Sequence, residues 1–231
     1  MTDQTPRKMT IDIYSDVMCP WCIIGYGQLK KGLAQLEGEI EAEIRWRPFE
    51  LNPDMPQQGE EQAEHIARKY RRTAEETQAV RGQMRSVAQQ AGVSLDYDGE
   101  GEAPPAMMWN TFDAHKALSW ALHTHGPQAQ HRLKLALFEA HFNKRRNIGQ
   151  RQVLLDVVAE TGLDRTEAER ALDDEQIARH VRAEEAQAFD LNITGVPAMI
   201  VDGKMLIPGA QAPEVYANAL RRVAAKFPAS G

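Results

Sequence analysis

The chain has 231 residues, of which 42% are hydrophobic and 26% charged, an ordinary balance for a globular protein that buries its own core. Its formal net charge of −6 argues against a nucleic-acid partner, because phosphate binding requires a basic surface. No apolar run approaches the roughly 18 residues that span a membrane. The first residues also lack the apolar stretch of a secretory signal, so we expect no membrane association and a cytoplasmic location.

The N-terminal quarter of the chain predicts a strand, a helix and a second strand. Residues 9–14 alternate between apolar and polar side chains, which is typical of a strand. Apolar residues then recur at helical spacing from Ile23 to Leu36, and Gly38 is typical of the position after a helix end. Residues 41–49 predict the second strand, before prolines break the regular pattern.

The middle of the chain, from about Glu60 to Asp190, has an almost wholly helical pattern. The expected helices cover residues 60–91, 106–125, 128–143, 150–161, 166–172 and 174–190. Strand character returns at residues 196–201, and Asp202–Gly203 predicts a hairpin turn into a last strand at residues 205–207. Residues 213–226 then predict a final helix with a proline in its first turn.

These elements follow the order β-α-β, a long helical block, and β-β-α. The two outer pieces together suffice for one mixed four-stranded sheet with helices on its faces. We therefore expect an α/β protein in which residues 1–58 and residues 189–231 build one domain. Residues 59–188 would form a large all-helical insertion domain packed on that sheet.

Both cysteines lie in one short segment, Cys19-Pro20-Trp21-Cys22, between the first strand and the first helix. A helix N-terminus favours a thiolate, and the thiolate is the form that attacks a disulfide. Cys19 would therefore attack, and Cys22 would resolve the mixed disulfide. Pro20 suits the first helical turn, where its missing N–H costs nothing. Trp21 would shield the pair from water or offer an apolar contact to a substrate.

Two other interpretations of the cysteine pair remain open. The pair could be half of a zinc site completed by His123, His125 or His131. Zinc needs four ligands, however, and these histidines supply no second tight motif, so we predict no metal site. The pair could also be two inert buried thiols. The position between a strand and a helix favours the redox-active interpretation over both.

The second motif is Thr194-Gly195-Val196-Pro197, at the start of a predicted strand. A proline cannot donate a hydrogen bond to a sheet, so its place there needs an explanation. One explanation is a cis Val196–Pro197 bond that leaves the Val196 backbone free to pair with an extended substrate. The alternative is a trans proline on an edge strand.

The CPWC and TGVP motifs together resemble the thioredoxin-fold superfamily, and the helical block between them looks like that of DsbA-type thiol–disulfide oxidoreductases. The segments IDIYSDVMCPWCIIG, RPFELNP, NTFDAHKALSWA, LFEAHF and FDLNITGVPAMIVDGK more closely resemble the FrnE-like branch of that family. This branch is related to 2-hydroxychromene-2-carboxylate isomerases and kappa-class glutathione transferases. The resemblance covers roughly residues 9–225.

The resemblance implies a thioredoxin fold with a helical insertion, disulfide chemistry at Cys19 and Cys22, and a cis Pro197 that faces the sulfurs. Relatives that use glutathione hold it between the cis-proline loop, the end of the second strand and the helical domain. The substrate-binding residues implied here are Pro20, Trp21, Asn52, Trp109, Thr194, Val196 and Gln211. Trp109 could equally belong to the core of the insertion.

Two positions depart from the family pattern. Pro-Trp replaces the Pro-His of strongly oxidising DsbA proteins, so we predict a Cys19 pKa between about 3.5 and 7, the values that bracket DsbA and thioredoxin. The buried carboxylate that many relatives carry six residues before the first cysteine is Ile13 here. Asp12 should point to the other face of the strand. Water or Asp16 would then move the proton of Cys22, unless Asp16 has only a loop or capping role.

The leading hypothesis is a protein-disulfide oxidoreductase or isomerase acting on thiol- or disulfide-containing proteins or small molecules through Cys19 and Cys22. Glutathione as a co-substrate or a thioredoxin-type partner would recycle it, with no tightly bound cofactor. The second hypothesis is a glutathione-dependent isomerase or transferase, which has no need of Cys22. A third is a non-catalytic binding protein. Helix-rich insertions often support homodimers, but no feature of this sequence fixes the oligomeric state.

Overall fold

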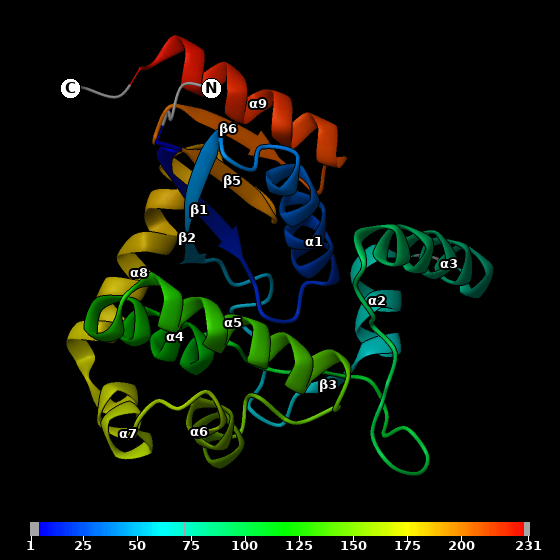
Figure 1. Ribbon diagram of the computed structural model, residues 1–231. Helices are drawn as coiled ribbons and strands as arrows, with labels where there is room; N and C mark the ends of the chain where they lie inside the picture. Colours follow the sequence, from blue (N-terminus) through cyan, green and yellow to red (C-terminus); the bar gives the residue numbers. More distant parts are fainter. Residues whose placement is uncertain (1–4, 72, 229–231) are drawn as a thin grey trace.

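Four strands from the two ends of the chain form one mixed sheet in the computed structural model, which describes residues 5–71 and 73–228 (Figure 1). The strands are β1 (Arg7–Ser15), β2 (Ile40–Pro48), β5 (Ala198–Val201) and β6 (Met205–Pro208), in the order β2-β1-β5-β6. Strand β1 pairs in parallel with β2 and antiparallel with β5, and β5 and β6 form a hairpin. This arrangement confirms the expected fold class.

The two faces of the sheet are covered by helices from different parts of the chain. Ile11 and Ile13 of β1 are fully buried in a core with helices α1 (Pro20–Ala34) and α9 (Pro213–Lys226). The other face lies toward helix α8 (Glu175–Asp190), where Arg47 joins Asp12 of β1 to Glu184. Asp12 therefore points away from the face that holds Ile11 and Ile13, as predicted from the alternation of the strand.

The segment between β2 and β5 contains mainly helices. They are α2 (Gln62–Tyr70), α3 (Ala74–Ala91), α4 (Phe112–His125), α5 (Pro127–Phe142), α6 (Arg151–Glu160), α7 (Arg165–Asp173) and α8. The helical pattern expected over residues 60–91 forms two helices, because the chain leaves helical geometry at Arg71, which has a left-handed φ of 49°. A capping box of Thr73 and Glu76 then starts the next helix.

The insertion also contains a small second sheet, which corrects the prediction that it is all-helical. Strand β3 (Glu60–Glu61) pairs antiparallel with β4 (Met107–Met108), and Gln62 N donates to Ala106 O at 2.8 Å. The helix expected from residue 106 therefore begins only at Phe112. Backbone pairing with a segment some 46 positions away overrides the local helical pattern. The boundaries at 58/59 and 188/189 stay predictions.

Helix α5 lies between the sheet and the other helices of the insertion. Leu133 and Leu137 pack into the core formed by α4, α6 and α7, whereas Phe138 and Phe142 pack into the core of the sheet. Side chains of α5 therefore reach the loops at the end of β1. Among the described residues, no helix is long and apolar enough to cross a membrane.

Candidate active site

The two cysteines lie at the N-terminus of helix α1, as predicted. Cys19 is the extended residue just before the helix, with φ −85° and ψ 112°, and Pro20 occupies the first turn. Cys22 N donates to Cys19 O at 3.0 Å, which completes that first turn. Both thiols are free, with Cys19 3% and Cys22 0% exposed. Of the two residues, Cys19 is the more exposed.

The loop before β5 lies directly against Cys19. Its Val196–Pro197 peptide bond is cis, so the cis alternative is confirmed. Sγ of Cys19 lies 3.7 Å from Val196 O. Helix α1 approaches this loop closely at Gly25, because a Cβ added there would lie 2.9 Å from Cγ of Pro197. The absence of a side chain at Gly25 thus allows the helix and the loop to hold the sulfur and the Val196 carbonyl in contact.

Asp16 lies in the loop that leads to Cys19, and its hydrogen bonds are those of the capping role; a part in moving the proton of Cys22 stays a prediction. It is fully buried, and its carboxylate accepts hydrogen bonds from Leu51 N at 2.8 Å and Met18 N at 3.3 Å. Its backbone carbonyl accepts from Cys19 N at 3.2 Å. Burial raises the pKa of Asp16, against these backbone donors and the charge of Lys134. Asp16 therefore joins the cysteine loop to the segment after β2.

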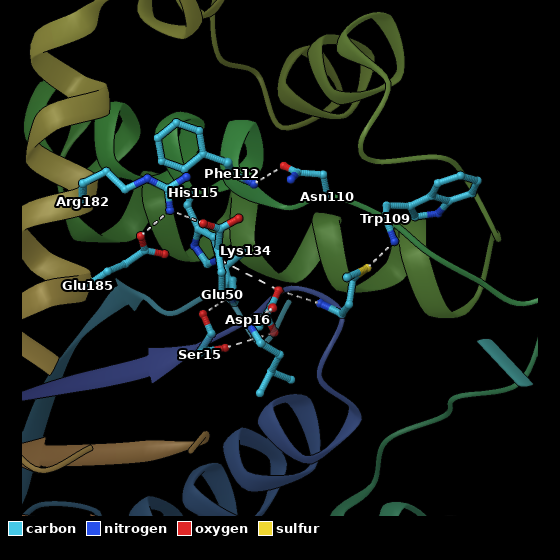
Figure 2. A network of polar contacts seen from close by, with 12 residues as sticks. Ser15, Asp16, Glu50, Trp109, Asn110, Phe112, His115, Lys134, Arg182 and Glu185 are labelled. Atoms are coloured by element: carbon cyan, nitrogen blue, oxygen red, sulfur yellow. Dashed lines mark hydrogen bonds and ion pairs between the residues drawn. The ribbon is translucent and has the colours of Figure 1, made fainter. Parts of the chain in front are cut away.

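A lysine that the sequence analysis missed lies beside the same loop. Lys134 of α5 is fully buried, and its Nζ donates to Ser15 O at 3.4 Å (Figure 2). The Nζ atom also lies 5.2 Å from the ring centroid of Trp46 and 4.9 Å from that of Phe138. Burial lowers the pKa of Lys134 to about 8, although the nearby charges of Cys22 and Asp16 favour its protonated form.

The pKa shifts of the two thiols differ from the prediction. The hydrogen bond with Cys22, and then burial, raise the pKa of Cys19 above the ordinary value, so the predicted low pKa of Cys19 is wrong for the reduced pair. Burial disfavours the thiolate of Cys22, but the hydrogen bond from Cys19 and the charge of Lys134 outweigh it and lower the pKa of Cys22. The buried cation of Lys134 interacts more strongly with the charge of Cys22 than with that of Cys19.

The remaining predicted substrate residues lie around the pair in different environments. Trp21 is half-buried and packs with Ile24 and with Ala88 and Ala91 of α3. The backbone N of Trp109 donates to Sδ of Met18 at 2.8 Å, and its side chain packs against the core of the insertion. The backbone of Trp109 is thus linked to the residue before Cys19, while its side chain belongs to the core of the insertion, as the alternative interpretation expected.

Asn52, Gln211 and Thr194 have less direct relations to the sulfurs. Asn52 follows Leu51, the partner of Asp16, and its Oδ1 accepts from Lys69 Nζ at 2.7 Å. Gln211 Nε2 donates to Pro208 O at 2.6 Å. Thr194 is exposed in the loop before Pro197. Their roles in substrate binding stay predictions.

The histidines considered as zinc ligands make other contacts: Nδ1 of His123 lies 2.8 Å from Ser119 O, and Nε2 of His125 lies 3.6 Å from Oε2 of Glu167. The ring of His131 contacts Tyr26 Oη at 2.9 Å and Trp46 Nε1 at 3.0 Å, which occupies both of its nitrogens. Within residues 5–71 and 73–228, no group of three or more His, Cys, Asp and Glu side chains could hold a metal ion.

This fold and site correspond to a known family. The model of the DsbA-like thioredoxin domain matches residues 10–221, so the chain belongs to the DsbA-like thioredoxin family. The probable DsbA oxidoreductase SCO1869 from Streptomyces coelicolor is 27% identical in sequence. Its crystal structure has a TM-score of 0.84 and covers 96% of this chain and 93% of its own.

Two other solved structures share the fold at lower sequence identity. A 2-hydroxychromene-2-carboxylate isomerase is 16% identical, with a TM-score of 0.65 over 94% of this chain and 97% of its own. The cytosolic disulfide reductase DsbM from Pseudomonas aeruginosa is 20% identical, with a TM-score of 0.61 over 94% of this chain and 99% of its own, and it has also been solved with GSH.

Proposed function

We propose that this protein is a thiol–disulfide oxidoreductase whose Cys19–Cys22 pair cycles between a dithiol and an intramolecular disulfide. The observation that carries this proposal is the contact of the Cys19 thiol with the carbonyl of Val196, with Cys22 buried beneath it in the first turn of α1. An extended substrate that pairs with the Val196 backbone would bring its disulfide to the sulfur of Cys19. Membership of the DsbA-like family supports the same chemistry.

The reaction follows from the charges around the pair. In the reduced pair the pKa of Cys19 is raised and that of Cys22 is lowered, so a proton shared by the two sulfurs passes to Cys22 as the Cys19 thiolate forms. The Cys19 thiolate then attacks the substrate disulfide, which forms a mixed disulfide and releases one substrate thiolate. That thiolate takes the proton of Cys22. Cys22 then attacks the sulfur of Cys19, closes the protein disulfide and releases the second substrate sulfur.

Lys134 acts on this reaction as a positioning residue. Its charge stabilises the thiolate form of Cys22, which is the leaving group when the protein disulfide is reduced. Asp16 lies on the same side, with its carboxylate held by two backbone N–H groups. The direction of net transfer depends on the redox potential of the pair relative to its partners.

Serine variants of the two cysteines test the proposal. In a graded glutathione buffer, mass spectrometry under non-reducing conditions should show a two-electron loss for the wild type, with closure between Cys19 and Cys22. Cys22→Ser should accumulate a mixed disulfide with glutathione on Cys19, and Cys19→Ser should exchange no disulfide. Thermal unfolding of each variant checks that it is folded. A wild type that stops at the mixed disulfide would contradict the proposal.

That contrary outcome would favour the second candidate, a glutathione-dependent isomerase or transferase. Lys69 supports a role for glutathione in either case, because its Nζ lies 3.0 Å from Leu51 O and 2.7 Å from Oδ1 of Asn52. It thus supplies a cation at the end of β2. The DsbM structure with GSH supports glutathione as a co-substrate of this fold. A thioredoxin-type partner, the cytoplasmic location and a homodimer stay predictions.

A further inference from the structure

A hollow that does not include the cysteines lies between helix α1, helix α5 and the segment that follows α3. Its volume is about 660 Å³, which is within the range of small-molecule pockets in proteins. One half-buried apolar side chain from each of these elements lines it: Ile23, Leu135 and Val93. From Ile23 the hollow follows α1 away from the sulfurs as far as Ala34. We call it the α1–α5 groove.

The walls of the α1–α5 groove are held in place by contacts within the protein. Helix α1 has no side chain at Gly27, where an added Cβ would lie 2.8 Å from Cγ2 of Val93. The segment after α3 can therefore lie directly against α1. Asn143 of α5 holds the later part of this segment, because its Nδ2 donates to Ser94 O at 3.1 Å and to Asp96 O at 2.9 Å. The groove is thus preformed, as most ligand pockets are.

The position of the proton on the ring of His131 follows from its two neighbours. The indole N–H of Trp46 can only donate, so Nδ1 of His131, at 3.0 Å, accepts and carries no proton. The neutral imidazole then carries its proton on Nε2, which donates to Tyr26 Oη at 2.9 Å. A second proton on Nδ1 would break the bond from Trp46. Burial and the charge of Lys30 also favour the neutral ring, since they lower the pKa of His131.

This arrangement leaves the hydroxyl proton of Tyr26 available to a ligand. Tyr26 lines the α1–α5 groove, and its oxygen accepts from His131, so its own O–H is free to donate. Lys30 lines the groove one helical turn further along α1. Within residues 5–71 and 73–228, its Nζ has no ion pair and no hydrogen bond. A donor and a cation therefore lie on the same wall of the groove.

The positive charge on this wall is not neutralised. Lys31 also lines the groove, and its Nζ donates to Gln90 O, which is a neutral acceptor. In the part of the chain that the structure describes, no carboxylate forms an ion pair with Lys30 or Lys31.

The acidic side chains of the groove lie near a different lysine. Asp98 and Glu139 both line the groove. Oδ1 of Asp98 is 3.0 Å from Nζ of Lys144, and the charge of Glu139 also acts on Lys144. The negative charge near the end of α5 thus has a compensating cation, whereas the positive charge on α1 does not. The groove should therefore prefer an anion.

We propose that the α1–α5 groove is a second ligand site, which binds a small monocarboxylate with an apolar body. The carboxylate accepts a hydrogen bond from Tyr26 Oη and lies near Lys30. The apolar body packs on Ile23, Val93 and Leu135. The site contains no cysteine and involves no covalent step, so this inference does not depend on the proposed function.

Titration with phenylbutyrate and with its neutral amide, phenylbutyramide, tests this inference. The methyl NMR signals of Ile23, Val93 and Leu135 should shift and saturate with the acid, with a dissociation constant of about 1 mM or lower. The amide should bind about tenfold more weakly, because it lacks the charge. The methyl signals of Val196 should not shift, which distinguishes the groove from the cysteine site.

Two substitutions on α1 have matched controls elsewhere in the chain. Tyr26→Phe removes the donor and keeps the ring, so it should weaken phenylbutyrate binding by about tenfold or more. Lys30→Gln removes a charge and should weaken binding by about two- to fivefold, because an exposed ion pair contributes little. Tyr97→Phe, whose hydroxyl donates to Glu100 O in the wild type, should bind as the wild type does. The same holds for Lys204→Gln, in the turn between β5 and β6.

Each outcome decides for or against the second site. No saturable shift at about 10 mM phenylbutyrate, equal binding of acid and amide, or unchanged binding in both α1 variants would overturn the inference. Shifts confined to Val196 would overturn it as well. If Tyr26→Phe does not fold, Lys30→Gln and the comparison of acid with amide still decide.

The cysteines separate this inference from the proposed function. Cys19→Ser should bind phenylbutyrate as the wild type does, because the groove does not include the sulfur. Failure of the wild type to form the Cys19–Cys22 disulfide would overturn the proposed function and leave the second site intact.

Discussion

Two successive turns of helix α5 bury a polar side chain near Trp46 of β2, and the two side chains differ in how far their hydrogen-bonding groups are satisfied. Gln130 is 1% exposed, and its amide accepts from Trp46 N at 2.9 Å and donates to Trp46 O at 2.7 Å. Since β2 is an edge strand, Gln130 covers backbone groups that would otherwise be unpaired. One turn later, Lys134 has one acceptor, Ser15 O at 3.4 Å, between two aromatic rings.

The difference shows how buried polar groups divide between stability and function. The Gln130 amide and the Trp46 backbone satisfy each other, so this contact stabilises the fold. Lys134 is a charged group with few partners, which costs stability and marks a candidate functional site. The charge of the buried lysine also lowers the pKa of Cys22, so the group that costs stability acts on the chemistry of the cysteine pair.

Replacement of Lys134 by methionine should have the largest effect. Folding lowers the pKa of Lys134 from 10.5 to about 8, which corresponds to about 3 kcal/mol against the folded state at neutral pH. This cost is fully present below about pH 8 and disappears as the pH rises toward the unfolded value. Lys134→Met should therefore raise the free energy of unfolding by up to about 3 kcal/mol at pH 7, and by less at pH 10, in urea titrations of the oxidised protein.

The same variant should make the cysteine pair less oxidising. Without the cation the Cys22 thiolate is less stable, so the equilibrium with glutathione should shift toward the disulfide by about tenfold or more. Lys116→Met is the matched control, because Lys116 is also buried but contacts Asp113 at 2.6 Å and Leu172 O. It should leave the redox equilibrium unchanged. A loss of stability in Lys134→Met, with no shift of the redox equilibrium, would show that Lys134 stabilises the fold as Gln130 does and has no effect on the cysteine pair.

Replacement of Gln130 by leucine should have the opposite pattern. The N–H and C=O of Trp46 would be left buried without partners, which should lower the free energy of unfolding by about 2 kcal/mol. The redox equilibrium should be that of the wild type, because Gln130 makes no contact with the cysteines. Urea unfolding and the glutathione equilibrium measured on one preparation would test both expectations. A shift of the redox equilibrium as large as that of Lys134→Met would show that Gln130 also affects the cysteine pair and does not act on stability alone.

His131, which lies between these two positions on α5, should give the smallest effect. Its ring contacts Tyr26 and Trp46, and burial, then the charge of Lys30, lower its pKa. The stability linked to this lowered pKa is present above about pH 6.5 and lost as the pH falls through the lowered value. His131→Phe should cost about 1 kcal/mol or less at pH 7 and remove this acid-dependent loss. An unchanged pH profile of thermal unfolding would refute this role.

Local patterns predicted most elements and the position of the cysteines. The alternation of residues 9–14 and the helical spacing after Cys22 depend on neighbours along the chain, and the structure has β1 and α1 there. The prediction of a helix from residue 106 was wrong, because β4 pairs with β3, which local spacing does not reveal. The predicted pKa of Cys19 was wrong for a similar reason, since the hydrogen bond with Cys22 and then burial raise it, and burial depends on the tertiary structure.

The sequence by itself determined the order of the elements, the family and the position of two thiols at the start of a helix. Periodicity and helix termini are set by residues a few positions apart, so they can be followed along the chain. Only the tertiary structure decided in which direction the pKa of each thiol shifts and which carboxyl groups share an arginine. Lys134 contacts a residue 119 positions away, and Glu50 contacts one 132 positions away. Electrostatic interactions depend on distance in space and on burial, and both are fixed only when the chain is folded.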